Sequence, residues 1–122
     1  MSHERISLGK KGELLVAEYL AQQGFDPIIK NFTCRHGEID LIAHDGNLIA
    51  CVEVKVRNNP YCTIAETVPY SKQKKIIMTA RSYALQYGYR EDESIVRFDV
   101  AFLEPQDHDY SITYIPNAFT LL

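Results

Sequence analysis

The spacing of apolar residues predicts two helices. In residues 9–23, apolar side chains recur at intervals of three and four, and Gly24 follows at the position of a left-handed C-terminal cap. Residues 71–87 show the same spacing, with Ser71 as the expected N-cap and Gly88 as the stop signal. Both segments therefore have an apolar stripe that can pack against a sheet.

Shorter runs of alternating or continuous apolar residues predict strands. The segment from His44 to Asn47 contains an Asp-Gly pair, which is typical of a tight hairpin turn. The resulting order, α-β-β-β-α-β-β, predicts an α/β fold with a central mixed sheet flanked by helices. The length of 122 residues suits one domain, spanning residues 1–122. The predicted strands are residues 28–33, 38–43, 48–57, 95–103 and 111–115.

Alternation along the hairpin formed by the second and third strands gives it two different faces. One face is expected to carry apolar side chains alone and to form the core. The other face is expected to be polar, with Ile42, Ile49 and Cys51 lying beside charged residues. The predicted core face consists of Ile39, Leu41, Ala43, Leu48, Ala50, Val52, Val54 and Val56.

The polar face brings acidic residues together, and the turn decides which of them oppose each other. If positions 45 and 48 close the turn, Asp40 lies opposite Glu53. If positions 44 and 47 close it, Glu38 lies opposite Glu53 and Asp40 is one diagonal step away. In either register the acidic side chains share one face and one end of the hairpin.

Carboxylates this close repel unless a proton or a divalent cation lies between them. Mg²⁺ and Mn²⁺ prefer oxygen ligands, often one or two carboxylates completed by water and phosphate. Lys55, two positions after Glu53, points to the same side and can contact a phosphate oxygen or orient water. Two carboxylates, a lysine and a metal suit phosphodiester hydrolysis. The alternative is a solvated face with ordinary cross-strand ion pairs, and spacing alone leaves both open.

Each predicted helix also carries a polar residue on its apolar stripe, Glu13 in the first and Gln73 in the second. A buried carboxylate needs a partner. If the helix starts cover the charged end of the hairpin, Glu13 becomes a third acidic group near the metal. The alternative for Glu13 is an acid in the first helical turn, stabilised by the helix dipole.

Charge is distributed unevenly along the chain. The net charge is −3, but residues 1–90 carry 12 basic and 9 acidic groups, and residues 91–122 carry 1 and 7. A local basic face therefore remains available for nucleic-acid phosphates, with a solvated helix face as the alternative. The three cysteines lack metal-ligand spacing and no long apolar stretch exists, so we expect a cytoplasmic protein without a membrane partner.

Two motifs resemble those of the PD-(D/E)-x-K nuclease superfamily. They are Gly37–Ala43 (GEIDLIA) and Val52–Lys55 (VEVK), followed by Arg57. The chain more closely resembles the YraN-like family of uncharacterised bacterial proteins. It departs from the superfamily pattern at Ile39, where Pro is usual before Asp, and from the YraN-like pattern in residues 67–71. Further matches are Gly12-Glu13, Ala17, Leu20, Asn31, Arg35, Glu66, Val68, Lys72-Gln73, Arg97–Val100 and Asn117–Phe119.

The resemblance implies a restriction-endonuclease-like core, similar to that of archaeal Holliday-junction resolvases. It further implies a metal-dependent endonuclease acting on DNA in preference to RNA, with branched or structured DNA as substrate. A homodimer would supply the two cuts that a symmetric junction needs. The alternatives are a non-catalytic nucleic-acid-binding module on the same fold and a protein-interaction domain in DNA processing.

The resemblance also assigns residues to roles. Asp40, Glu53, the carbonyl of Val54 and Glu13 would hold Mg²⁺ or Mn²⁺, and Lys55 would be the catalytic lysine. The residues expected to contact nucleic acid are Arg57, Lys72, Gln73 and Lys75.

Overall fold

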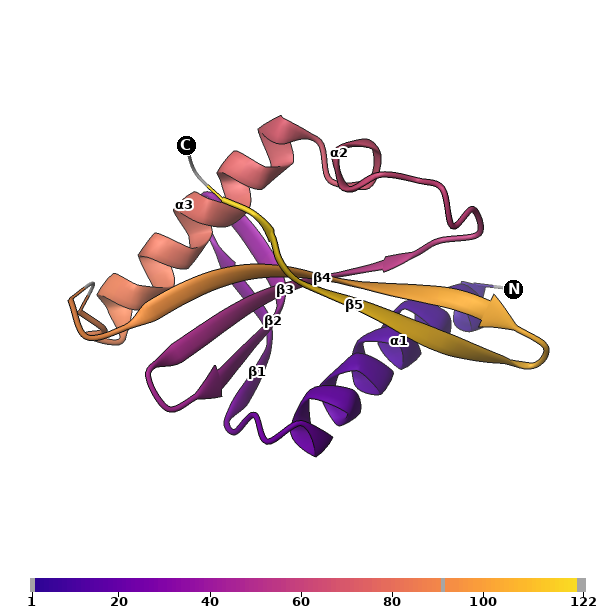
Figure 1. Cartoon of the computed structure of the whole chain (residues 1–122), viewed down its shortest axis with the longest axis horizontal. Coiled ribbons are helices and arrows are strands. Elements are labelled where there is room, and N and C mark those ends of the chain that lie inside the picture. The colour runs from indigo at the N-terminus through magenta and orange to yellow at the C-terminus, as the bar shows by residue number, and fades with distance from the viewer. Residues whose placement is uncertain (1, 91, 121–122) are drawn as a thin grey trace.

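Five strands form a mixed sheet between two long helices in the computed structural model, which describes residues 2–90 and 92–120 (Figure 1). Helices α1 and α3 lie on opposite sides of this sheet. The predicted order of elements and the α/β class are confirmed. The elements are α1 (Ser2–Gln22), β1 (Ile28–Cys34), β2 (Gly37–Asp45), β3 (Leu48–Val56), α2 (Ile64–Thr67), α3 (Tyr70–Gln86), β4 (Ile95–Gln106) and β5 (Asp109–Phe119).

The strands follow one another across the sheet in the order β1-β2-β3-β4-β5. Neighbours are antiparallel except β3 and β4, which are parallel. A parallel pair requires a crossover connection, and the segment containing α2 and α3 supplies it. The long β4–β5 hairpin extends past the other strands on the side of α1 (Figure 1).

Both faces of the β2–β3 hairpin are buried, so the predicted polar face is wrong over most of its length. Ile42, Ile49 and Cys51 lie in the apolar cluster beneath α3. The crossover helix covers this face, which an isolated hairpin would leave in water. The predicted core face packs against α1 through Leu41 and Val52, but Ile39 belongs to the cluster on the α3 side.

Several element boundaries differ from the expected ones. Helix α1 begins at Ser2, and the expected loop before α3 contains α2, capped by the Thr63 hydroxyl accepting from the Glu66 amide at 3.2 Å. Helix α3 follows Pro69 with no side-chain cap, so Ser71 is not its N-cap. Strand β5 continues to Phe119, which pairs with Phe98, because pairing with β4 extends it beyond its local pattern.

Near the C-terminus Phe119 is buried, and Leu121 and Leu122 lie outside the described residues. Within residues 2–90 and 92–120, no helix is both long and apolar enough to span a membrane.

Gly12 allows α1 to approach β4 closely. A Cβ atom at this position would lie 2.5 Å from Cδ1 of Leu103, a side chain that is itself buried. We expect Gly12→Ala to lower the free energy of unfolding by about 1 kcal/mol, because the overpacking cost exceeds the gain in helix propensity. Urea denaturation measures this change. In a Leu103→Val background, Gly12→Ala should cause a smaller loss of stability than it does in the wild type. A Gly12→Ala protein as stable as the wild type, or more stable, would contradict the predicted clash with Leu103.

Candidate active site

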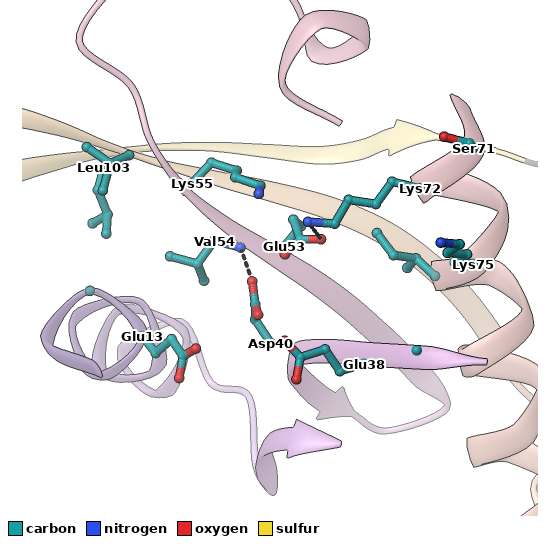
Figure 2. Close-up of a pocket in the computed structure, with 14 residues that line it drawn as sticks. Glu13, Glu38, Asp40, Glu53, Val54, Lys55, Ser71, Lys72, Lys75 and Leu103 are labelled. Atoms are coloured by element: carbon teal, nitrogen blue, oxygen red, sulfur yellow. Dashed lines mark hydrogen bonds and ion pairs between the residues drawn. The ribbon is translucent and has the colours of Figure 1, made fainter. Parts of the chain in front are cut away.

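A cavity of about 510 Å³ opens between α1, the sheet and the first turns of α3 (Figure 2). Acidic and basic side chains from both helices and two strands meet in it. The cavity therefore joins segments far apart in the sequence around one charged centre. Its ionisable lining residues are Glu13, Glu38, Asp40, Glu53, Lys55, Lys72 and Lys75.

Asp40 lies where regular pairing between β2 and β3 ends. The register pairs Asp45 with Leu48 and runs as far as Leu41 with Val52, which is the first of the two registers left open by the sequence. Beyond it, Oδ2 of Asp40 accepts a hydrogen bond from the Val54 amide at 2.8 Å (Figure 2). The carboxylate thus takes a donor that a strand neighbour would otherwise satisfy, and this bond fixes it over β3.

Glu53 is the buried carboxylate of the cavity, with a side chain only 8% exposed. Burial raises the pKa of Glu53 to about 8, and the neighbouring carboxylate of Asp40 contributes to the increase. Glu53 forms an ion pair with Lys72, whose Nζ lies 3.4 Å from Oε2 of Glu53. The strands thus hold two carboxylates close enough to disfavour ionisation of one of them.

Two lysines converge on the same carboxylate from different elements. Lys55 extends from β3, and its pKa is lowered, first by burial and then by the nearby ammonium of Lys72. For Lys72, burial lowers the pKa, but a hydrogen bond to the Lys55 amine and the attraction of the Glu53 carboxylate outweigh this, so its pKa is raised. Figure 2 shows the two ammonium groups directed toward each other above Glu53. The carboxylates of Asp40 and Glu53 thus lie next to a concentrated positive charge.

Helix α1 contributes Glu13 from the opposite side of the cavity. Its carboxylate points toward the space occupied by Asp40 and Glu38 (Figure 2). The preceding residue, Gly12, lines the cavity too, so its close approach to β4 determines how far Glu13 reaches. The structure therefore brings Glu13, Asp40 and Glu53 to one cavity, together with Val54, Lys55, Lys72 and Lys75.

Arg57 and Gln73 have other partners. The guanidinium of Arg57 lies 3.3 Å from Glu104 and 3.9 Å from the ring centroid of Phe102. The amide of Gln73 donates to the Val68 carbonyl at 2.9 Å. Neither residue lines the cavity, and these contacts tie the end of β3 and the start of α3 to neighbouring segments. Such partners are long-range or main-chain groups, which motif spacing does not reveal.

The donor atoms in the cavity fit a hard divalent cation. Asp40 and Glu53 offer carboxylate oxygens, and burial together with the neighbouring Asp40 carboxylate raises the pKa of Glu53 even though two lysines lie nearby. The described residues contain no cluster of three or more His, Cys, Asp or Glu side chains close enough to enclose a metal. Mg²⁺ and Mn²⁺ do not require one, since water and substrate phosphate complete their coordination in many sites.

Glu53 should destabilise the metal-free fold at neutral pH. Its carboxyl has a pKa near 4.5 in an unperturbed setting and about 8 in the fold. As pH rises between these values, the unfolded chain releases the proton while the folded protein retains it, so the free energy of unfolding falls. We therefore expect Glu53→Gln to raise the free energy of unfolding at pH 7 by on the order of 2 kcal/mol. Below pH 4.5 this gain should vanish. Urea denaturation in the presence of a chelator measures it.

The matched control for this prediction is Glu38→Gln, because Glu38 lines the same cavity but is exposed. Its substitution should change stability by less than about 0.5 kcal/mol. Equal stabilities of the wild-type and Glu53→Gln proteins at pH 5 and pH 7.5 would contradict the raised pKa.

The fold and the cavity define an α/β protein with a paired-carboxylate and lysine site, and the chain belongs to the uncharacterised protein family UPF0102. The model of this family matches residues 12–103. A UPF0102 protein of Chlorobium limicola is 41% identical over 126 residues, covering 98% of this chain and 96% of the relative. A UPF0102 protein of Clostridium tetani is 40% identical, covering 93% and 94%. These matches confirm the family resemblance and assign no activity.

Among solved structures, the chain is similar to Hjc of Archaeoglobus fulgidus, described as a Holliday junction resolvase from an archaeal hyperthermophile. The TM-score is 0.49 at 20% sequence identity, and the alignment covers 88% of this chain and 71% of the Hjc chain.

Proposed function

We propose that this protein is a metal-dependent endonuclease that hydrolyses phosphodiester bonds in DNA. The supporting observation is the convergence of Asp40, Glu53 and Lys55 in one cavity, with Glu53 buried and its pKa raised to about 8. Perturbed carboxylates in a cavity are characteristic of functional sites, although ion-pair networks also produce them. Here the two acids are accompanied by a lysine whose pKa is lowered by burial.

In this proposal Asp40, Glu53 and the carbonyl of Val54 would hold Mg²⁺ or Mn²⁺. Glu13 would complete the site from α1 through coordinated water, since the three carboxylates are not close enough to enclose the ion directly. A divalent cation supplies charge that polarises the phosphoryl group and activates water. The hydrogen bond from the Val54 amide keeps Asp40 oriented, so the carboxylate need not reorganise during the reaction.

The basic side chains act on the phosphate. Lys55 is partly buried beside the carboxylates, where its ammonium stabilises charge that develops on the phosphoryl oxygens or orients the attacking water. Lys75 is exposed at the cavity and can contact the phosphate backbone. Arg57 and Gln73 have no role in this proposal, because their partners hold them elsewhere.

Cleavage assays test the proposal. The purified protein is incubated with Mn²⁺ or Mg²⁺ and end-labelled duplex, flap and four-way-junction DNAs, with matching RNAs for comparison. We expect cleavage of DNA, with branched substrates preferred as the sequence resemblance implies, and its abolition by a chelator. Absence of cleavage on every substrate by a protein that is folded by circular dichroism would contradict the proposed activity.

A further inference from the structure

Lys72 lies against the Glu53 carboxylate, which is one of the proposed metal ligands. Its Nζ lies 3.4 Å from Oε2 of Glu53 (Figure 2). The two partners differ in burial, since the side chain of Glu53 is 8% exposed and that of Lys72 is 41% exposed. Glu53 is therefore enclosed at β3, whereas the end of the Lys72 side chain borders solvent.

A divalent cation and the Lys72 ammonium compete for the same oxygen. Their like charges repel strongly where water is partly excluded, so both cannot lie against Glu53 at once. Lys55 already lies beside Lys72 in the cavity, which adds to the positive charge there. Movement of Lys72 toward solvent relieves both repulsions, and no rearrangement of the sheet is required.

We propose that Lys72 is a resident counter-cation of Glu53, which the metal displaces, and that the displaced ammonium then binds the substrate phosphate. This inference rests on the proposed nuclease function. It assigns Lys72 a positioning role that depends on whether metal is bound: it pairs with the ionised form of Glu53 in the metal-free protein and faces the substrate in the loaded one. Metal binding and phosphate binding are then coupled through one side chain, and the coupling is reciprocal.

Calorimetric titration with Mn²⁺ in the absence of DNA tests this role. We expect Lys72→Gln to bind Mn²⁺ about three- to tenfold more tightly than wild type, which is the range expected for loss of one competing, partly exposed ion pair. Lys72→Arg retains the competing charge and should bind within about twofold of wild type. Lys75→Gln is the matched control, because Lys75 lines the same cavity but it is Lys72 that pairs with Glu53. Its Mn²⁺ affinity should also stay within about twofold of wild type.

The proposal is overturned if Lys72→Gln binds Mn²⁺ no more tightly than wild type, or if Lys75→Gln gains as much. Glu53→Gln separates this failure from failure of the proposed function. If Glu53→Gln binds Mn²⁺ as well as wild type does, the metal site itself is wrong. If it loses binding while Lys72→Gln shows no gain, only the counter-cation role fails.

Discussion

Replacing Lys55 with Ala is expected to lower the rate of DNA cleavage by about 100-fold or more. The ammonium lies partly buried in the cavity beside Glu53 and Asp40, so neither water nor an exposed lysine can replace it. Its removal takes positive charge from the phosphoryl group in the transition state. It removes no metal ligand, so Mn²⁺ affinity should not fall. Single-turnover cleavage at saturating Mn²⁺ measures the rate.

Lys75→Ala is the matched control for this prediction. Lys75 lines the same cavity but is exposed on α3, and its loss should lower DNA affinity more than the rate at saturation. If Lys55→Ala cleaves DNA at a rate within about threefold of wild type, Lys55 is not a catalytic residue, even if the protein is a nuclease.

The second large effect is expected on stability, at Asp99. This side chain is fully buried and accepts hydrogen bonds from Nε and Nη2 of Arg97, both at 2.9 Å, from the Tyr114 hydroxyl, and from the Asn117 amide at 2.8 Å. Asp99→Ala would leave all these donors without their acceptor. We expect the free energy of unfolding to fall by about 3 kcal/mol, as when one partner of a buried charged pair is removed. Urea denaturation measures the loss.

Tyr114→Phe provides the graded comparison, because it removes one donor from Asp99 and leaves the others in place. It should cost about 1 kcal/mol. A loss below about 1 kcal/mol for Asp99→Ala would show that Asp99 does not anchor the irregular β4–β5 pairing between Phe98 and Val100.

Short-range patterns predicted that the carboxylates and the lysine lie near one another. The Asp-Gly turn and the two-residue period placed Asp40, Glu53 and Lys55 together, because neighbouring positions in a hairpin depend on local geometry. The apolar stripe of α1 likewise indicated that Glu13 faces inward. The structure selects one of the two registers that the sequence left open.

The face prediction failed because burial of the second hairpin face depends on α3, which follows β3 in the chain and covers the sheet from the other side. The continuous apolar run of β3 was the available signal, since strands covered on both faces lose their alternation. Departure of Asp40 from regular pairing was also unpredictable, because it follows from a side-chain hydrogen bond to Val54.

Long-range side-chain contacts could not be predicted either, because they too depend on how distant elements pack. The sequence marked Arg57 and Lys72 as basic, but Arg57 pairs with Glu104 on β4 and Lys72 pairs with Glu53 on β3. The positive charge of Arg57 thus stabilises the fold, whereas that of Lys72 lies in the cavity. Only the packing of α3 and β4 against the hairpin distinguishes them.

A crystal structure of the protein soaked with Mn²⁺, with anomalous diffraction to locate the ion, tests the central claim most directly. A peak within about 2.5 Å of carboxylate oxygens from both Asp40 and Glu53 is the predicted result. A Mn²⁺ peak elsewhere on the protein, with Glu53 still paired to Lys72 and no ion between the two carboxylates, would contradict the assignment of this cavity as a metal-dependent active site.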